Sequence, residues 1–384
     1  MNQSTQVIRK NITQWGGIEV SRLGFGAMRL PTGGDRKIDW EKAAAMVDKA
    51  VESGVNYFDS AYLYHGGESE LFLGETLKKY PRDSYYLATK MPVASVDSEE
   101  KFNTIFEDQF RKLQTDRIDF YLLHGLNAIR METVREFDIV NKLIEKKKEG
   151  KIRFMGFSYH GDLDTFSELI DMGVWDFAQI QINYLDYDMI NAKGFYDKLV
   201  SANVPCVCME PVRGGWLANP PDEVKALMAG FEGGGVTPAG WGFRWCIDKD
   251  NMAVILSGMS TMEQVKENIE TFSADHQITP AQGEMLASVT NIITDIKSLP
   301  CTACRYCMEC PSGVDIPEIF RIYNHFKTFK NAFRASEEYK ALVHFGHGAN
   351  KCTRCGACTP KCPQEISIPD RLDEVKDILL NAMR

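Results

Sequence analysis

Residues 118–124 read IDFYLLH, an apolar run that ends on a histidine. A parallel strand that is buried on both faces has this near-continuous apolar character. Seven similar runs lie along residues 20–272, with amphipathic helical patterns between them, and together they give eight expected strands: Arg22–Gly26, Val55–Ser60, Tyr85–Lys90, Ile118–His124, Ile152–Ser158, Phe177–Asn183, Pro205–Pro211 and Ala253–Gly258. Eight strand–helix units in about 250 residues predict an α/β fold of the (β/α)8 TIM-barrel type.

The helical patterns between these runs have identifiable start and stop signals. Asp39–Ser53 has apolar residues at helical spacing behind Asp39 as a cap. Ser98–Leu113 and Glu132–Lys148 are similar, and Gly150 is a stop signal after the second. Ahead of the barrel, Ile8–Val20 and its WGG turn predict a β-hairpin.

An open doubly wound sheet is the alternative architecture. It would carry a G-x-G-x-x-G motif after the first strand. Residues 24–29, GFGAMR, hold two of the three glycines, so the barrel is favoured. We expect no internal repeat beyond the strand–helix unit. Gly230–Gly235 is expected to be a flexible loop without a phosphate-binding role.

The composition narrows the classes of protein to consider. The chain has 384 residues, of which 44% are hydrophobic and 25% charged, which excludes a disordered or fibrous protein. A net charge of −9 argues against nucleic-acid or membrane partners. Neither a transmembrane segment nor a secretory signal is predicted, so a cytoplasmic location is expected.

The cysteines divide the chain into two parts. None of the 11 precedes Cys206, and eight lie between Cys301 and Cys362. In a large chain without a signal peptide, such a cluster favours metal binding over disulfides. We therefore predict a barrel domain over residues 1–275 and a C-terminal all-α domain over residues 276–384.

Four chemically suited residues lie at or just after the ends of three successive expected strands. These are Asp59 and Tyr64 after the second strand, Lys90 at the end of the third and His124 at the end of the fourth. In a barrel of this type, chemistry takes place at the carboxyl ends of the strands. A phenol with a pKa near 10 becomes a useful acid when an ammonium lowers that pKa and a carboxylate holds the ammonium. The set suits proton delivery to a carbonyl group.

These residues lie in motifs that resemble the aldo/keto reductase superfamily. The motifs are DSAYLYHGGESELFLG at 59–74, ATK at 88–90, IDFYLLH at 118–124 and GFS at 156–158. The resemblance covers about residues 15–272. It implies that Tyr64 is the general acid, that Lys90 and Asp59 tune it, and that His124 binds the carbonyl. Tyr62 is the close competitor as the acid, and the family's spacing favours Tyr64.

The resemblance also implies a nicotinamide cofactor, NAD(P)H, across the barrel mouth. Its implied contacts form four groups: Gly26, Met28 and Arg29 after the first strand; Ser158 and Gln181 for the carboxamide; Glu210, Pro211, Val212, Arg213 and Gly214 in the pyrophosphate loop; and Ser257, Gly258, Met259, Ser260, Gln264 and Asn268 at the adenosine end. Many members have Asn where this chain has Tyr159. Many NADPH-dependent members have Lys and Arg where this chain has Gly258 and Gln264. A 2′-phosphate favours such cations, so we expect NADH to be used at least as well as NADPH.

The C-terminal cysteines form two motifs, each of which ends in Cys-Pro. The motifs are C-x2-C-x2-C-x2-C-P, with Cys301, Cys304, Cys307 and Cys310, and C-x2-C-x2-C-x3-C-P, with Cys352, Cys355, Cys358 and Cys362. Such runs bind [4Fe–4S] clusters, and in two-cluster ferredoxins the fourth cysteine ligates the other cluster. That rule pairs Cys362 with the first three cysteines and Cys310 with the later three.

Two alternatives to this cluster prediction stay open. The first alternative is a pair of zinc sites with four cysteines each, although zinc favours paired C-x2-C knuckles. The second alternative is a labile or three-iron cluster. It stays open because the x2 spacing before Cys310 is irregular, which also weakens the assignment of cysteines to clusters. Cys206, Cys208 and Cys246 lie on apolar stretches and are expected in the core.

The segment between the two motifs is expected to be helical. Apolar residues at near-helical spacing predict a helix over Pro317–Phe333, and Thr279–Leu299 is expected to be a connecting helix. This region resembles helical dicluster ferredoxin domains, so we expect a dicluster ferredoxin-like fold. The whole chain resembles a subgroup of aldo/keto reductases with such a 4Fe–4S tail.

Three functions follow as hypotheses. The first is an NAD(P)-dependent oxidoreductase for a small carbonyl or alcohol substrate, whose tail exchanges electrons with a partner such as a ferredoxin or flavoprotein, or serves structure or redox sensing. The second is an electron-transfer protein on a catalytically retired barrel, which the intact set of four residues disfavours. The third is an oxygen or iron sensor.

Overall fold

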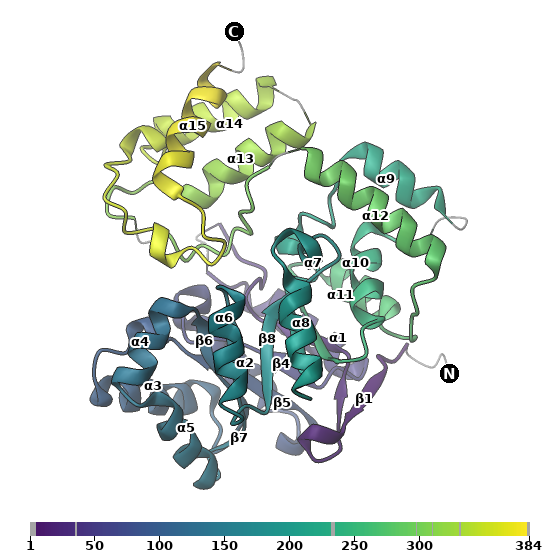
Figure 1. Cartoon of the computed structure of the whole chain (residues 1–384), viewed down its shortest axis with the longest axis vertical. Coiled ribbons are helices and arrows are strands. Elements are labelled where there is room, and N and C mark those ends of the chain that lie inside the picture. Colours follow the sequence, from purple (N-terminus) through teal and green to yellow (C-terminus); the bar gives the residue numbers. More distant parts are fainter. Residues whose placement is uncertain are drawn as a thin grey trace. The chain divides into compact units, whose positions relative to one another are not determined.

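The computed structural model describes residues 5–34, 37–231, 235–296, 298–308, 310–329 and 332–381 (Figure 1). The chain divides into two compact units. One unit contains Met1–Pro211 and Gly242–Ile278, and the other contains Val212–Trp241 and Thr279–Arg384. Among the residues described, no helix has the length and apolar character needed to cross a membrane.

The first unit contains a closed barrel of eight parallel strands in the order β10-β3-β4-β5-β6-β7-β8-β9. Each strand is one of those expected, with ends that differ by at most two residues: β3 (Leu23–Gly26), β4 (Tyr57–Asp59), β5 (Tyr86–Met91), β6 (Ile118–Leu126), β7 (Ile152–Tyr159), β8 (Phe177–Gln181), β9 (Cys206–Met209) and β10 (Met252–Gly258). The barrel closes where Gly258 pairs with Gly26. The predicted (β/α)8 barrel is therefore confirmed, and the open sheet is excluded.

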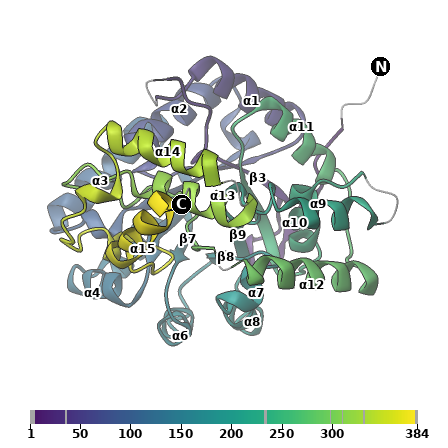
Figure 2. The same cartoon turned by 90° about the horizontal axis from the view of Figure 1, so that it is seen from above.

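Helices surround this barrel (Figure 2). They are α1 (Trp40–Glu52), α2 (Glu68–Leu77), α3 (Glu99–Leu113), α4 (Ala128–Glu136), α5 (Ile139–Lys148), α6 (Leu163–Asp171), α7 (Asp186–Met189), α8 (Ala192–Ser201), α10 (Pro238–Ile247) and α11 (Met262–Thr271). The Asp39 side chain caps α1, as expected, and Ser98 caps α3 by accepting from the backbone N–H of Lys101.

The single helix expected over Glu132–Lys148 is wrong. The chain forms α4 and α5 instead, and Asp138 between them has a left-handed φ of 51°. The first helix also begins earlier than expected, because Asn127 caps it by accepting from the backbone N–H of Arg130 at 2.9 Å. A left-handed residue cannot continue an α-helix, so α5 begins anew after Asp138.

The predicted N-terminal hairpin, β1 (Arg9–Ile12) and β2 (Ile18–Ser21), packs against one end of the barrel. Its turn carries the buried Trp15, whose ring lies 4.7 Å from that of Phe120 in an edge-to-face arrangement. Phe154 and Phe177, from neighbouring strands, also contact this ring. Aromatic packing therefore fills the amino-terminal end of the barrel, and the chemistry-bearing residues lie at the other end.

The second unit is helical. It contains α9 (Asp222–Ala229), α12 (Pro280–Asp295), α13 (Ile316–Phe329), α14 (Ala332–His344) and α15 (Ile368–Asn381), together with the first residues of α10. Helices α13, α14 and α15 contact one another around a buried apolar core that includes Phe320, Tyr323 and Leu372. The expected all-α character of the C-terminal region is confirmed.

Three expectations in this unit need comment. The helix expected over Pro317–Phe333 is wrong in extent, since α13 ends at Phe329 and α14 begins at Ala332, while residues 330–331 lie outside the described part of the chain. The helix expected over Thr279–Leu299 is α12, and Thr279 forms a capping box with Gln282. The loop expected at Gly230–Gly235 includes residues 232–234, which also lie outside the described residues.

Candidate functional site

Three of the four candidate catalytic residues are held together at the carboxyl ends of neighbouring strands. The Lys90 ammonium donates to Asp59 Oδ1 and to the backbone oxygen of Ser60, both at 2.6 Å. It also lies 4.9 Å from the centre of the Tyr64 ring. Asp59 and Lys90 are buried, so this contact is protected from solvent screening.

His124 completes this group on β6. Its ring centre lies 5.8 Å from that of Tyr64, with the two planes at 81°. Tyr64 begins a short turn in which Gly66 and Gly67 have φ values of 65° and 93°, a conformation that glycine adopts without strain. The turn leads directly into α2, so the chain places the phenol between the lysine and the histidine.

The competing phenol, Tyr62, lies elsewhere. The Lys112 ammonium is 3.9 Å from the centre of its ring, and Asp108 accepts a hydrogen bond from its side chain. Both of these partners belong to α3 rather than to a strand end. Of the two tyrosines, the structure therefore places Tyr64 beside Lys90 and His124.

The electrostatics of the group follow from burial and its internal contacts. Burial raises the pKa of Asp59 and lowers that of Lys90, and the ion pair between them opposes both shifts. Burial, helped by the cations Lys90 and Arg130, holds the pKa of His124 well below its usual range. His124 is therefore neutral at physiological pH and carries one ring proton with which to donate a hydrogen bond.

The residues predicted for the carboxamide lie at the ends of β7 and β8. Ser158 is buried, and its hydroxyl accepts from the backbone N–H of Gly125 at 2.7 Å. Gln181 donates through Nε2 to the buried carboxylate of Asp186 at 2.8 Å, and Asn183 donates to the same oxygen at 2.7 Å. A carboxylate only accepts, so it fixes which end of the Gln181 amide carries the oxygen.

The residues predicted for the adenosine end also form a hydrogen-bonded group. Asn268 donates to the Ser257 hydroxyl at 2.9 Å, and Gln264 accepts from the backbone N–H of Ser260 at 2.7 Å. The Ser260 hydroxyl donates to the backbone oxygen of Arg29. Met259, next to Ser260 in the chain, is buried. Gly26 at the end of β3 pairs with Gly258 at the end of β10, and Met28 follows β3.

The predicted pyrophosphate loop spans the boundary between the two compact units. Glu210 and Pro211 belong to the barrel unit, where Glu210 forms an ion pair with Arg29 at 3.6 Å. Val212, Arg213 and Gly214 belong to the second unit. The Arg213 side chain is buried, and its guanidinium carbon lies 6.0 Å from the centre of the Trp216 ring.

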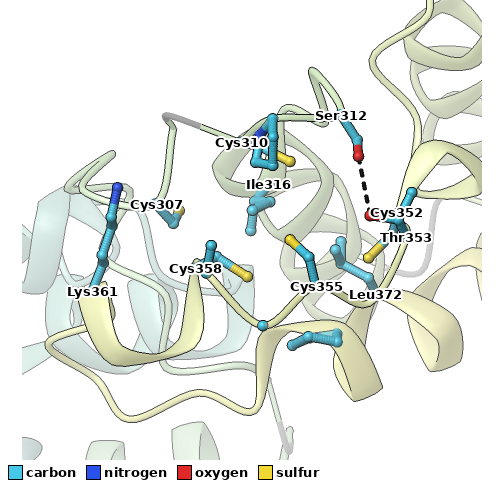
Figure 3. A pocket seen from close by; sticks show the side chains of 14 residues that line it. Cys307, Cys310, Ser312, Ile316, Cys352, Thr353, Cys355, Cys358, Lys361 and Leu372 are labelled. Atoms are coloured by element: carbon cyan, nitrogen blue, oxygen red, sulfur yellow. Dashed lines mark hydrogen bonds between the residues drawn. The ribbon is translucent and has the colours of Figure 1, made fainter.

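The eight C-terminal cysteines line two cavities in the second unit. One cavity has Cys301, Cys304, Cys307 and Cys362 in its wall. The other, of about 390 Å³ including space open to solvent, is lined by Cys310, Cys352, Cys355 and Cys358, and also by Cys307. Figure 3 shows the sulfur atoms of Cys352, Cys355 and Cys358 turned toward a common space. Cys362 thus lines a cavity with the first three cysteines and Cys310 lines one with the later three, as in the exchanged pairing, while Cys307 lines both cavities.

The pKa shifts of the thiols follow the same grouping. Burial raises the pKa of Cys307, and the neighbouring Cys304, Cys301 and Cys362 raise it further. Burial likewise raises the pKa of Cys358, with Cys352 and Cys310 as its neighbouring thiols. A cationic iron cluster would hold these sulfurs as thiolates, so the donor set suits it chemically.

The two cysteine motifs share the same backbone geometry. Ala303 and Arg305 in the first loop have φ values of 54° and 66°, and Arg354 and Gly356 at the matching places in the second have 56° and 76°. Each loop then leads through Cys-Pro to an Ile-Pro pair that opens a helix, α13 or α15.

The placement of the cysteines bears on the zinc alternative. Among the described residues, no three of Cys, His, Asp or Glu converge closely enough to hold one ion. A tetrahedral zinc ion needs four sulfurs about 2.3 Å away, whereas a cubane places its ligands at separate corners. The two runs of three cysteines before Cys-Pro favour clusters over zinc. Cys206, Cys208 and Cys246 lie in the barrel core as expected, all fully buried.

The comparisons with known proteins agree with both parts of the chain. The family model described as "Aldo/keto reductase family" matches residues 22–291, and that described as "4Fe-4S dicluster domain" matches residues 300–367. The chain therefore belongs to the aldo/keto reductase family, a family of oxidoreductases, and carries a 4Fe–4S dicluster domain after the barrel.

Individual relatives resemble the barrel part. L-galactose dehydrogenase of Arabidopsis thaliana is 26% identical over 74% of this chain and 93% of its own length. The NADH-specific methylglyoxal reductase of Escherichia coli is 26% identical over 66% of this chain and 90% of its own. An aldo-keto reductase from Bacillus halodurans in its holo form is 26% identical, with a TM-score of 0.60 over 74% of this chain and 96% of that one. A Klebsiella pneumoniae aldo-keto reductase in complex with NADPH, 19% identical with a TM-score of 0.59, shares the fold.

Sequence reasoning missed several residues that support the site. Arg130 and His160 lie near enough to His124 to lower its pKa, and burial brings the pKa of His160 itself to about 3. Asp186 accepts from Gln181 and so orients its amide, and the buried carboxylate of Glu70 accepts from Thr89, the residue next to Lys90. The Asn183-x2-Asp186 spacing and the place of Glu70 on the apolar face of α2 were the available signals.

Proposed function

We propose that this chain is a nicotinamide-dependent oxidoreductase that reduces a carbonyl group, or oxidises the matching alcohol, with Tyr64 as general acid or base. The observation that carries the proposal is the buried Lys90 ammonium, held by Asp59 at 2.6 Å and facing the Tyr64 ring. Family membership and the relatives named as dehydrogenases and reductases support it. The domain boundaries proposed with it are residues 1–275 and 276–384.

Each residue has one task in this reaction. The Tyr64 hydroxyl delivers a proton to the oxygen that forms when the carbonyl is reduced. The Lys90 ammonium stabilises the phenolate left behind, and Asp59 keeps the ammonium in place. Neutral His124 donates a hydrogen bond to the carbonyl oxygen and orients it for attack. In the oxidation direction the same proton returns to Tyr64.

The residues predicted to bind the cofactor support an NAD(P)H site across the strand ends. When bound, the nicotinamide supplies or accepts the hydride. The Gln181 oxygen is oriented to accept from the carboxamide, because Asp186 holds the amide nitrogen. Ser158 accepts from Gly125 and keeps its own hydroxyl proton to donate. The holo and NADPH-bound relatives support a site of this kind.

We expect the wild-type protein to use NADH at least as well as NADPH. The 2′-phosphate of NADPH would favour cationic side chains at positions 258 and 264. This chain has glycine and the uncharged Gln264 there. The Gln264→Arg variant should raise the NADPH-to-NADH ratio of kcat/KM by about tenfold, since Arg binds phosphate with charge-assisted hydrogen bonds. Steady-state kinetics with both cofactors measure the ratio. A strong NADPH preference in the wild-type protein would contradict this expectation.

We further propose that the tail holds two [4Fe–4S] clusters. Cys301, Cys304, Cys307 and Cys362 would ligate one, and Cys310, Cys352, Cys355 and Cys358 the other. Their chemistry is one-electron transfer, so the tail suits exchange with a partner such as a ferredoxin or flavoprotein, redox sensing, or structural support. The substrate is proposed to be a small carbonyl or sugar compound, as the names of the methylglyoxal and L-galactose enzymes suggest.

An anaerobic NADH titration of the cluster-loaded protein, followed by EPR, tests both parts together. Nicotinamide transfers electrons in pairs and clusters accept them singly, so NADH alone should leave the cluster signals unchanged on the time scale of turnover. Adding a flavoprotein should then allow the clusters to be reduced. Cluster reduction by NADH alone at the turnover rate would contradict the expected separation. Absence of carbonyl-dependent NADH oxidation would favour a retired barrel.

A further inference from the structure

A second buried carboxylate lies behind the proposed catalytic lysine. Glu70, on α2, is completely buried, as are its neighbours Thr89 and Gln109. Its Oε1 accepts from the Thr89 hydroxyl at 2.6 Å and from Gln109 Nε2 at 2.9 Å. Side chains alternate along a strand, so Thr89 faces the helices while Lys90 faces the barrel mouth. Glu70 therefore holds the outer face of the strand at the residue next to Lys90.

Gln109 links this carboxylate to Lys90 itself. Its amide nitrogen lies 3.1 Å from the backbone oxygen of Lys90 and 3.2 Å from the Thr89 hydroxyl. Its amide oxygen accepts from the Tyr121 hydroxyl at 2.5 Å, which fixes the orientation of the amide. Each of these groups is buried, so the network would be costly to leave incomplete.

The packing of α2 on α3 fixes the position of Glu70. A Cβ at Gly74, one turn after Glu70, would lie only 2.3 Å from the backbone oxygen of Lys112. Only glycine allows the two helices to approach this closely. The close approach brings the Glu70 carboxylate within reach of Gln109 and within 3.8 Å of the Lys112 ammonium.

Two donors and one cation face the Glu70 carboxylate. Thr89 and Gln109 donate hydrogen bonds to its Oε1, and the Lys112 ammonium lies 3.8 Å from its Oε2 without a hydrogen bond. Burial raises the pKa of Glu70, with a smaller contribution from Asp108, and the two hydrogen bonds and the Lys112 charge oppose that rise. Lys90 therefore has two carboxylates near it: Asp59, which contacts its ammonium, and Glu70, on the outer side of β5. Both raise the pKa of Lys90 and so oppose the effect of burial. Tyr64 and His124 are its other neighbours.

We propose that Glu70 is a positioning residue for the reaction: through Thr89 and Gln109 it fixes the end of β5, and its charge helps to keep Lys90 protonated beside Tyr64. Glu70 itself touches neither substrate nor cofactor in this role. The inference rests on the proposed function, because it assigns Glu70 to the Lys90–Tyr64 pair.

The test compares Glu70→Gln with Glu75→Gln, a control on the same helix with an exposed side chain. Glu70→Gln keeps the shape of the side chain and removes its charge. We expect kcat for carbonyl reduction to fall about tenfold to a hundredfold, with KM for NADH nearly unchanged. The alkaline limb of the kcat–pH profile should move down by about one pH unit, because Lys90 loses its proton more readily without the second carboxylate. Glu75→Gln should match the wild type.

Three outcomes would overturn the inference, and they differ in meaning. If Glu70→Gln lowers the melting temperature but leaves kcat and the alkaline limb unchanged, the residue is only structural. The Tyr64→Phe variant is assayed in the same series. If wild-type turnover does not depend on Tyr64, the proposed function has failed and the role of Glu70 fails with it. If turnover depends on Tyr64 but not on Glu70, the inference about Glu70 alone is wrong.

Discussion

Replacing Tyr64 with phenylalanine should lower kcat for carbonyl reduction by roughly 10²–10⁴-fold, the contribution of a well-placed general acid. The substitution removes one hydroxyl and keeps the ring that lies between Lys90 and His124. Cofactor binding should be unaffected, because the hydroxyl acts on the substrate oxygen. Turnover measured by NADH oxidation, together with NADH affinity measured by fluorescence titration, separates the two effects.

Tyr62→Phe is the matched control. It makes the same chemical change two residues earlier, on a phenol that faces Lys112 and Asp108. Its kcat should stay within about twofold of the wild type, since surface polar contacts contribute little. Equal activity of Tyr64→Phe and the wild-type protein would contradict the assignment of Tyr64, and a large loss in Tyr62→Phe alone would transfer the role to Tyr62.

The barrel could be predicted from sequence because its strands carry a strong local signal. Runs such as Ile118–His124 are apolar apart from Asp119 and the final histidine, and only a strand covered on both faces needs that near-continuous character. The place of Asp59, Lys90 and His124 followed from the parallel topology, which brings the carboxyl ends of strands to one face. Tyr64 needed the family spacing as well, since the left-handed turn after it leaves no periodic signal.

The contacts between elements could not be predicted in the same way. The break at Asp138 depends on a single residue in a left-handed conformation, which interrupts an otherwise continuous helical pattern. Glu70 lies three residues before Leu73 on the buried side of α2, so its position was readable from helical spacing. Its partner Gln109 lies 39 residues away in the sequence, and only the packing of α2 on α3 shows that they meet.

The proposed cluster ligands illustrate both situations. They could be proposed from spacing alone, because three cysteines at three-residue intervals before Cys-Pro form a specific pattern. Their pairing depends on how two segments about 50 residues apart fold together, and the structure groups Cys362 with the first motif. The equivalent left-handed residues in the two loops show that the two cysteine motifs share one backbone geometry.

Two crossed double variants decide the pairing of cysteines with clusters. In the exchanged pairing, Cys304 and Cys362 share one cluster, so Cys304→Ala/Cys362→Ala should lose one cluster and keep the other. Cys355 and Cys362 then belong to different clusters, so Cys355→Ala/Cys362→Ala should lose both. Iron content should fall from about eight atoms per chain to about four in the first variant and to about zero in the second.

The alternative of two local clusters predicts the reverse. If each motif held its own cluster, Cys355 and Cys362 would share one, and the variant that changes them would keep about four irons while the other lost all. Anaerobic iron analysis and EPR of the reduced proteins distinguish the two patterns. Cys206→Ala, which removes a thiol from the barrel core, controls for the general effect of removing a cysteine and should keep about eight irons. Because Cys304 and Cys355 occupy matching places in the two loops, the two double variants disturb equivalent positions, and a difference between them reports the pairing.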